Sequence, residues 1–347
     1  MRSSRRARGS ATIVDVAAAA GVSPSTVSRA IRGHPDVGEQ TRAQVLASAD
    51  TLRYRPSTLA RALASGRSQT IGLLVSDIAN PFYPRLAKAV ERECRKRHYS
   101  LVICNTDDSE LESVEYVERL TDQGVEGFIH ASVGIDEGPV LEALRDAKRI
   151  VFANRRPRSE SVSYVVSNNE AGGRQLGEHL VSLGHRRIGF VAGPSWASSV
   201  EERRRGLSQA LEGCGGQLLV AEGDFAATKA PQAVRALLAA AIRPTAIVGI
   251  NDRVAGGVYG LLLDLGLHVP GEVALAGFDN IDFGWVQALS LTTVAQRTDT
   301  MGRRAVEILL RQLDKPSVRI TRQELPMDLL VRGTTDAGQT SSRAEVP

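Results

Sequence analysis

Three short segments with a helical pattern fill the first sixty residues. Apolar side chains recur at helical spacing in each of them: Ile13, Val16, Ala17 and Ala20, then Val27, Ala30 and Ile31, then Val45, Ala49 and Leu52. Each set forms one buried face of a helix. Thr12 and Asp15 are spaced as in a capping box, and Gly21 can end the first helix in a left-handed conformation. The pattern predicts a bundle of three short helices.

The turn between the first two helices has a form that is used to bind DNA. Ser23 can cap the second helix and Pro24 occupies its first position. This helix-turn-helix arrangement places the second helix in the major groove. Arg29 can then donate two hydrogen bonds to a guanine, and the hydroxyls of Thr26 and Ser28 suit phosphate or thymine. A plain helical hairpin would show the same spacing, so the pattern alone leaves both interpretations open.

Short apolar runs alternate with helical patterns from Gln69 onward. The predicted strands are 71–75, 101–104, 127–130 and 149–152 in a first series, and 188–191, 217–220, 246–250 and 273–276 in a second. Repeated βαβ units of this kind imply a parallel sheet covered by helices on both faces. Two series predict two similar lobes with a cleft between them. A helix at 298–313 is expected to cross back and complete the first lobe.

Polar residues recur where the predicted strands end: Asp77 and Asn80, Asn154 and Arg155, Asn251 and Asp252, Asp279 and Asn280. Open α/β sheets bind ligands at the carboxyl ends of their strands. With Arg203, this set can form several hydrogen bonds to a polyhydroxylated or otherwise polar small molecule. Phe82, Phe225 and Trp196 could supply an apolar wall. Any one of these residues could be a helix cap or a turn, but their recurrence at four strand ends favours a site.

Charge is distributed unevenly along the chain. Residues 1–67 contain 11 arginines, no lysine and four acidic residues, a net charge of +7. The whole chain has 43 basic and 39 acidic residues, which leaves 32 and 35 for the remainder, a net charge of −3. A basic segment on a mildly acidic body indicates a polyanionic partner. A solubilising tail would explain only residues 2–8, because the other seven arginines lie within patterned segments.

Length and composition narrow the class further. A chain of 347 residues is too long for one core, so two or three domains are expected. It has no apolar run of 18 residues, and its basic N-terminus leads into no apolar signal core. We therefore expect a cytoplasmic, nucleoid-associated protein with no membrane partner. Three widely spaced cysteines favour neither a disulfide framework nor a zinc site, and we expect no metal and no cofactor.

Several runs resemble the lactose/galactose repressor family. They are Thr12-Ile-Val-Asp-Val-Ala, Ala20-Gly-Val-Ser-Pro-Ser-Thr-Val-Ser-Arg29, Tyr54-Arg-Pro-Ser-Thr-Leu-Ala-Arg-Ala-Leu63, Asp77-Ile-Ala-Asn-Pro-Phe-Tyr83 and Gly277-Phe-Asp-Asn280. The resemblance implies an α/β chain with an N-terminal all-α helix-turn-helix module and a two-lobed, periplasmic-binding-protein-like body with two parallel sheets. The expected boundaries are a basic disordered tail at 1–10, a DNA-binding domain at 11–55, a hinge helix or linker at 56–68, an effector-binding and dimerisation domain at 69–333 and a disordered tail at 334–347. Within the body, lobe 1 takes about 69–166 and 296–326, and lobe 2 about 167–295 and 327–333.

The resemblance also implies two sets of site residues. The DNA-binding set is Thr12, Ser23, Pro24, Ser25, Thr26, Ser28, Arg29, Arg32, Tyr54, Ala60 and Leu63, with Leu63 as a minor-groove wedge. The effector-binding set is Asp77, Phe82, Asn154, Arg203, Phe225, Asn251, Asp279 and Gln296. Arg32 stands where the family often has Asn, and Gly38 where Ser usually caps the third helix. Asn154 and Asn168 each replace a usual Asp, which leaves the effector open beyond a leading expectation of a sugar.

These observations predict a transcription regulator, most simply a repressor. It would bind a pseudo-palindromic double-stranded operator as a homodimer, with a small effector between the lobes controlling its DNA affinity. The alternatives are a solute-binding receptor or an enzyme on the same two-lobed fold. The sequence has no Gly-x-x-x-x-Gly-Lys-Ser/Thr, Gly-x-Ser-x-Gly or His-Glu-x-x-His motif, and we expect no catalytic residues.

Overall fold

The computed structural model describes residues 11–31, 33–54, 68–132, 134, 136–144, 149–282, 288–315, 317 and 319–335. The chain divides into two compact units, 1–68 and 69–347, which are described separately below as the N-terminal unit and the larger unit. The predicted tail at 1–10, the predicted DNA contacts Arg32, Ala60 and Leu63, and most of the predicted hinge lie outside the described residues. No helix in the described part of the chain is long and apolar enough to cross a membrane.

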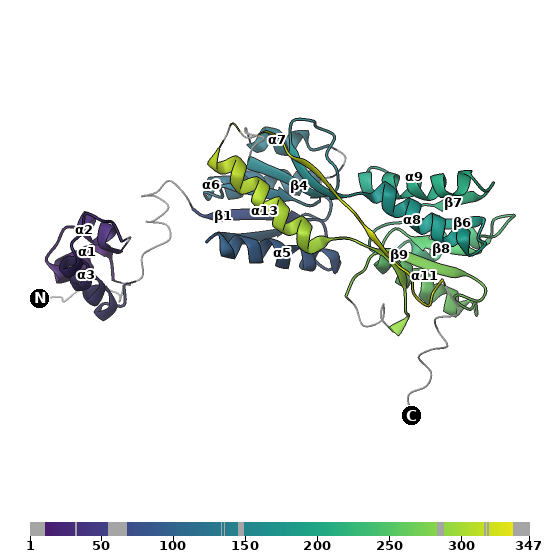
Figure 1. Ribbon diagram of the computed structural model, residues 1–347, viewed down its shortest axis with the longest axis horizontal. Coiled ribbons are helices and arrows are strands. Elements are labelled where there is room, and N and C mark those ends of the chain that lie inside the picture. The colour runs from purple at the N-terminus through teal and green to yellow at the C-terminus, as the bar shows by residue number, and fades with distance from the viewer. Residues whose placement is uncertain are drawn as a thin grey trace, which may run out of the picture. The chain divides into compact units, whose positions relative to one another are not determined.

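Three helices form the described part of the N-terminal unit, as the apolar spacing predicts: α1 (Ile13–Ala20), α2 (Pro24–Ile31) and α3 (Glu39–Thr51) (Figure 1). Val16, Val27 and Val45 lie at its core, and each is fully buried. The capping box at Thr12 is present and Gly21 has φ 63°. The backbone N–H of Thr26 donates to the Ser23 hydroxyl at 3.1 Å, which starts α2. The helix pair therefore presents the predicted helix-turn-helix geometry.

Two six-stranded sheets form the larger unit. The first has the order β11-β5-β4-β3-β1-β2 and comprises β1 (Thr70–Val75), β2 (Ser100–Asn105), β3 (Gly127–His130), β4 (Ile150–Asn154), β5 (Ser163–Ser167) and β11 (Arg322–Leu325). The second has the order β12-β10-β9-β8-β6-β7 and comprises β6 (Arg187–Val191), β7 (Gln217–Ala221), β8 (Ala246–Gly249), β9 (Ala274–Asp279), β10 (Thr292–Ala295) and β12 (Asp328–Leu330). The β10–β12 pair is antiparallel and the other strand pairs described are parallel. The two lobes thus repeat one strand order.

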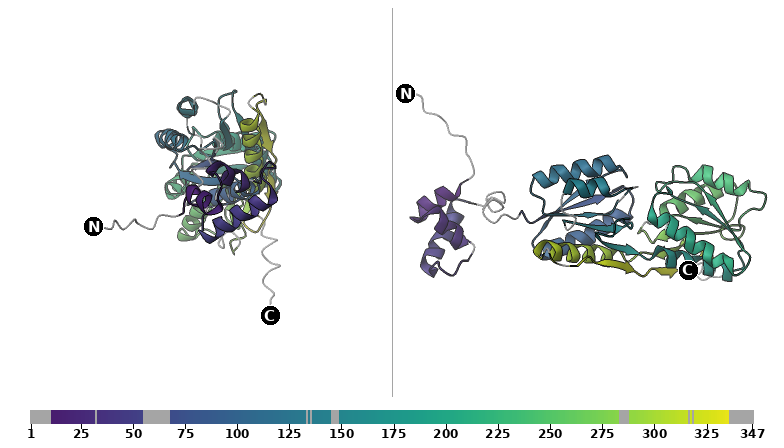
Figure 2. Two further views of the ribbon diagram at one scale, coloured as in Figure 1. Left: turned by 90° about the vertical axis from the view of Figure 1, so that its left-hand side faces the viewer. Right: turned by 90° about the horizontal axis from the view of Figure 1, so that it is seen from above.

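Helices cover both faces of the first sheet because its strands are apolar on both sides. Leu73 points to the face covered by α5 (Phe82–Lys96) and α13 (Thr298–Asp314). The next residue, Leu74, points to the face covered by α6 (Glu110–Asp122) and α7 (Gly138–Leu144). In the right-hand view of Figure 2 the yellow-green α13 and the teal α6 and α7 lie on opposite sides of the sheet.

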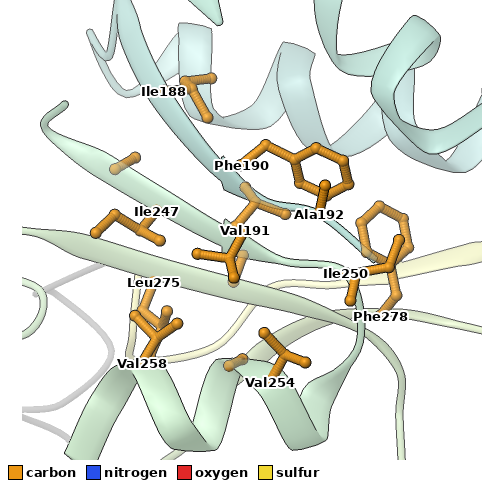
Figure 3. Packing of buried hydrophobic residues seen from close by; sticks show 14 of the residues in the cluster. Ile188, Phe190, Val191, Ala192, Ile247, Ile250, Val254, Val258, Leu275 and Phe278 are labelled. Carbon is orange, nitrogen blue, oxygen red and sulfur yellow. The ribbon is translucent and has the colours of Figure 1, made fainter. Parts of the chain in front are cut away.

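The second sheet is built in the same way. Its helices are α8 (Asn169–Ser182), α9 (Ser198–Glu212), α10 (Ala230–Leu238) and α11 (Asp252–Asp264). In Figure 3, Val254 and Val258 of α11 lie against the face that carries Leu275, and the ring of Phe278 lies on the opposite face. Arg203 of α9 places its guanidinium 4.5 Å from the Phe278 ring centroid, so α9 covers that second face.

The chain crosses between the lobes three times. The crossovers are the links β5–α8, β10–α13 and β11–β12. The second of them returns the chain to the first lobe, as the sequence predicts, and α13 packs there beside α5. In Figure 1 the yellow-green segments run between the two lobes. The three crossovers therefore join the lobes, and a rotation of one lobe relative to the other would have to change the backbone of these segments.

The end of the ordered body differs from the prediction. The prediction of a disordered tail at 334–347 is wrong for Thr334 and Thr335, because they are 2% and 6% exposed. The backbone N–H of Thr292 donates to the Thr334 hydroxyl at 2.8 Å, and the Thr292 and Thr335 hydroxyls lie 2.7 Å apart. Small polar residues resemble a tail in sequence, but here they complete the hydrogen bonding of a buried strand end.

Close packing of α8 on α9 fixes the position of Arg203. A Cβ on Gly206 would lie 2.6 Å from the Arg174 nitrogen and would overlap the Glu170 carbonyl, so the helices meet backbone to backbone. We expect Gly206→Ala to destabilise the larger unit by about 1–3 kcal/mol in urea unfolding. The control is Gly260→Ala on α11, where a Cβ has open space and alanine should add about 0.5–1 kcal/mol. Equal effects of the two substitutions would contradict the packing described.

Candidate effector site and DNA-binding face

A cavity of about 250 Å³ lies where strand ends of the two lobes meet. Its lining residues are Ser76, Asp77, Asn80, Phe82, Tyr83, Asp107, Asp108, Asn154, Arg155, Pro194, Ser199, Arg203, Asp224, Phe225, Ala226, Asn251, Asp279 and Gln296. All eight residues of the predicted effector-binding set are among them. The fold therefore brings together side chains that are up to 219 positions apart in sequence, from Asp77 to Gln296. That they bind an effector stays a prediction.

Two equivalent strands supply residues with an unusual backbone. Asn154 ends β4 with φ 66°, and Asp279 ends β9 with φ 101°. β4 and β9 hold the same place in the two strand orders. A left-handed backbone costs a residue other than glycine about 1–3 kcal/mol and concentrates at ligand sites. The strain thus falls on the two lobes symmetrically, at the residues that enter the cavity.

Arg203 and Asp279 form a buried ion pair at the floor of the cavity. Arg203 Nη2 donates to Asp279 Oδ1 at 3.2 Å, and the two side chains are 4% and 7% exposed. Arg203 also donates from Nε to Asn169 Oδ1 at 2.9 Å and from Nη1 to the Ile250 carbonyl. Gln296 Nε2 donates to the same Asp279 Oδ1 at 2.7 Å. Because Oδ1 takes two donors, the other oxygen of Asp279 is the atom best placed to accept from a ligand.

The first lobe contributes a second charged pair and an aromatic surface. Arg155 Nη1 donates to Asp108 at 2.6 Å, and the Arg155 guanidinium lies 4.8 Å from the Phe225 ring centroid, on the other lobe. The Ser76 hydroxyl donates to the Tyr83 hydroxyl at 2.7 Å. Burial raises the pKa of Tyr83, so its hydroxyl stays protonated and neutral.

Sequence reasoning missed part of this wall. Tyr83, Asp107 and Asp108 line the cavity, and so does Arg155, a strand-end residue that the predicted effector-binding set does not include. The two aspartates follow the predicted strand 101–104, which is β2. Because ligands bind at the carboxyl ends of strands in open α/β sheets, this position alone could have indicated them. Tyr83 carries no such signal, because its spacing is that of a core residue of α5.

Three residues considered at the strand ends or in the wall do not line the cavity. Trp196 is not among the lining residues, and its ring centroid lies 5.0 Å from the Arg155 guanidinium. Asn280 Oδ1 accepts a hydrogen bond from Arg332 at 2.8 Å. Asp252 accepts from the Thr293 hydroxyl at 2.6 Å and from the Ile281 backbone at 3.0 Å. The polar groups of Asn280 and Asp252 therefore bond to other residues of the second lobe and do not line the cavity.

Asp252 gives the larger unit a characteristic pH dependence. Burial, and next the carboxylate of Asp279, raises the pKa of Asp252 to about 8. The folded state then binds this proton more tightly than the unfolded state, so stability falls as pH rises from about 4 to about 8, by up to about 1.4 kcal/mol per pH unit. In Asp252→Asn the amide can donate to Thr293 and accept from Ile281. We expect the urea midpoint of the wild type to fall between pH 6 and 8 more steeply than that of this variant, and parallel curves would refute the assignment.

Most of the predicted DNA-binding residues that are described lie on α2 or just before it. Ser25 and Arg29 are exposed, while Val27 and Ala30 of the same helix are buried in the bundle. Pro24 and Ser23 are exposed, Thr26 and Ser28 are half-buried, and Thr12 is exposed at the start of α1. Tyr54 packs against the core of the bundle. α2 thus offers a polar face with one arginine beside short hydroxyl side chains.

The comparisons with known proteins cover both units. The family model for bacterial regulatory proteins of the lacI family matches residues 12–57, and the periplasmic binding protein-like domain matches residues 178–335. The ribose operon repressor of Halalkalibacterium halodurans is 34% identical over 96% of this chain and 99% of its own length. The HTH-type transcriptional repressor PurR of Photobacterium profundum is 32% identical over 93% and 98%. The chain belongs to the lacI family.

Solved structures agree with this assignment. The lac repressor dimer bound to operator and the anti-inducer ONPF has a TM-score of 0.85 and 28% identity, covering 94% of this chain and 99% of that one. A LacI family transcriptional regulator from Enterococcus faecium with bound ribose has a TM-score of 0.69 and 29% identity, covering 76% and 98%. The predicted family, fold class and function as a DNA-binding transcription repressor are confirmed. The relatives named here are repressors and not enzymes.

Proposed function

We propose that this lacI-family repressor binds a two-fold operator as a homodimer and that a neutral monosaccharide in the cavity controls its DNA affinity. The observation that carries the proposal is the cavity itself, where both lobes contribute hydrogen-bonding side chains and an aromatic surface. A ligand that contacts both lobes binds more tightly to one arrangement of them than to another. That difference in affinity is what shifts an equilibrium between two states.

The charges of the cavity favour a neutral ligand. Five carboxylates line it, from Asp77, Asp107, Asp108, Asp224 and Asp279, against the guanidinium groups of Arg155 and Arg203. The lining residues carry a net charge of −3, or −2 when Arg253, which pairs with Asp77 at 2.8 Å, is included. Each carboxylate is an acceptor that suits a hydroxyl donor. A phosphorylated sugar would bring further negative charge to this wall and is disfavoured.

The size of the cavity favours a single sugar ring. Its volume of about 250 Å³ is below the range of about 300–1,000 Å³ that is usual for drug-sized ligands. Phe82 and Phe225 can pack on the apolar face of a ring while the carboxylates take its hydroxyls. The ribose bound by the Enterococcus faecium regulator and the name of the ribose operon repressors support a pentose as the first candidate.

The N-terminal unit supports the DNA side of the proposal. It is strongly basic, with a net charge of +7 over residues 1–67, and α2 exposes Arg29. Two such units in a dimer would read the two halves of a two-fold operator. Affinity for DNA should then fall steeply as salt rises, whereas a solute receptor or an enzyme on this fold would have little DNA affinity to lose.

A thermal-shift panel tests the effector class. The purified repressor is heated with D-ribose, other pentoses and hexoses, their phosphates and nucleobases. A ligand at 100 times its Kd adds about 2.7 kcal/mol of stability, so a neutral monosaccharide should raise the Tm measurably. Asp279→Asn is the control, because an amide NH₂ replaces the free acceptor while the remaining oxygen can still accept from Arg203 and Gln296. The substitution also turns the buried ion pair into a neutral contact, so the Tm of the variant with sugar is compared with its own Tm without sugar. Stabilisation by sugar phosphates alone, or an equal response of the variant, would contradict the proposal.

A further inference from the structure

One hydrogen-bonded ring joins the cavity floor to two of the three crossovers. The Ser167 hydroxyl donates to Gln296 Oε1 at 2.7 Å, and Gln296 Nε2 donates to Asp279 at 2.7 Å. Arg203 connects Asp279 to Asn169 Oδ1, and Asn169 Nδ2 donates back to the Ser167 carbonyl at 3.1 Å. Ser167 and Asn169 flank the first crossover, and Gln296 lies in the second. All five side chains of the ring are buried.

Glu202 connects this ring to the third crossover. Its Oε2 accepts from Asn169 Nδ2 at 3.1 Å and its Oε1 accepts from Arg156 Nε at 2.9 Å. Arg156 Nη2 donates in turn to Glu324 at 3.0 Å, on β11 just before that crossover. The Arg156 backbone N–H donates to the Ser198 hydroxyl at 2.8 Å, on the other lobe. Glu202 is only 14% exposed and, like Asn169 and Arg156, is not among the residues that line the cavity.

We propose that Glu202 is a positioning residue that transmits occupancy of the cavity to the three crossovers and so sets the response of the lobes to the effector. The inference rests on the proposed function. A ligand that accepts or donates a hydrogen bond at Asp279 changes the ion pair of Asp279 with Arg203. Arg203 Nε also donates to Asn169, so a movement of Arg203 shifts Asn169. Asn169 and Arg156 are both held by the one carboxylate of Glu202, through hydrogen bonds to a charged acceptor, which are stronger than neutral ones. A shift at the cavity floor therefore reaches all three crossovers through connected groups.

Glu202→Gln tests this relay without changing the size of the side chain. Arg156 and Asn169 donate to different oxygens of the Glu202 carboxylate, and glutamine replaces one of these oxygens by an NH₂ group, which cannot accept, so one link is lost. The matched control is Glu201→Gln, the preceding residue, whose carboxylate pairs with Arg204 at 2.7 Å on the more exposed side of α9. Both variants remove one negative charge from the same helix turn.

The first readout is amide hydrogen exchange of the full-length repressor without any sugar. The Asn168 N–H, which donates to the Leu325 carbonyl at 2.8 Å, reports on the first and third crossovers, and the Thr298 N–H reports on the second. We expect exchange at these crossovers to be about tenfold faster in Glu202→Gln, with the rest of the larger unit within about twofold of Glu201→Gln. Unchanged exchange rates at the crossovers would overturn the inference. Faster exchange over the whole larger unit would also overturn it, because that result indicates a general loss of stability.

The second readout is the response of operator binding to D-ribose as the probe. We expect D-ribose to change the operator Kd of the wild type and of Glu201→Gln by about 5- to 150-fold. In Glu202→Gln the same sugar should change the operator Kd by less than about threefold. The Kd of Glu202→Gln for D-ribose itself should stay within about threefold of the wild-type value. An undiminished response would refute the relay. If D-ribose does not bind the wild type, the effector class of the proposed function fails, and the exchange comparison alone decides the inference.

Discussion

Arg203→Ala is expected to destabilise the larger unit by about 3–5 kcal/mol, because it removes one partner of a buried ion pair. Asp279 would be left buried without its guanidinium and near the carboxylate of Asp252, which already has a raised pKa. Asn169 and the Ile250 carbonyl would each lose a donor as well. The measurement is urea unfolding followed by tryptophan fluorescence, since Trp196 and Trp285 both belong to the larger unit.

Arg204→Ala is the control for this substitution. Arg204 is the next residue on α9 and pairs with Glu201 at 2.7 Å, but both side chains are more than 40% exposed. Exposed pairs contribute about 0–1 kcal/mol, so little change is expected. If the free energy of unfolding of Arg203→Ala lies within 1 kcal/mol of that of Arg204→Ala, the buried hydrogen bonds of Arg203 do not stabilise the larger unit.

Arg29→Ala is expected to have the largest effect on DNA binding. A bidentate contact of arginine with guanine contributes about 1–3 kcal/mol of discrimination, and a dimer would lose it at both half-sites. The operator Kd should therefore rise by about 5- to 150-fold for each half-site. The measurement is fluorescence anisotropy on an operator selected from random DNA, with a scrambled duplex of equal length beside it.

The scrambled duplex separates reading of bases from simple attraction of charge. Loss of one arginine per unit lowers the affinity for any duplex slightly, because one phosphate-attracting charge is gone. If Arg29 reads a base, the ratio of operator affinity to scrambled affinity falls. Equal losses on both duplexes would place Arg29 at the phosphate backbone and not at a base edge.

The helical bundle and most strands could be predicted because their signals are local. The cap at Thr12, the glycine that ends α1 and the apolar strands act within a few residues of one another. The sequence pattern does not predict β5, β10, β11 or β12. In β5 and β10 the apolar pattern is interrupted by the polar residues Ser163, Ser167, Thr292 and Thr293, which are fully buried. Their hydroxyls are satisfied from far along the chain, as when Gln312 Nε2 donates to Ser163 at 2.9 Å. Such partners leave no local pattern.

The site shows the same division between local and distant signals. Strand ends could be located, and the residues after them do reach one cavity. Which polar side chains face it could not be foreseen, because Asp252 and Asn280 bond to distant segments while Asp279 and Asn154 turn inward through a left-handed backbone. The pairing of Arg155 with Asp108 depends on the meeting of two loops 47 residues apart.

The most direct test of whether the cavity controls DNA binding is an operator titration with and without the sugar that stabilises the repressor. Anisotropy on the selected operator gives the Kd in each condition, for the wild type and for Asp279→Asn. We expect a saturating sugar to change the wild-type Kd by about 5- to 150-fold and to leave that of the variant unchanged. Equal wild-type Kd values with and without bound sugar would contradict the claim that the cavity controls DNA binding.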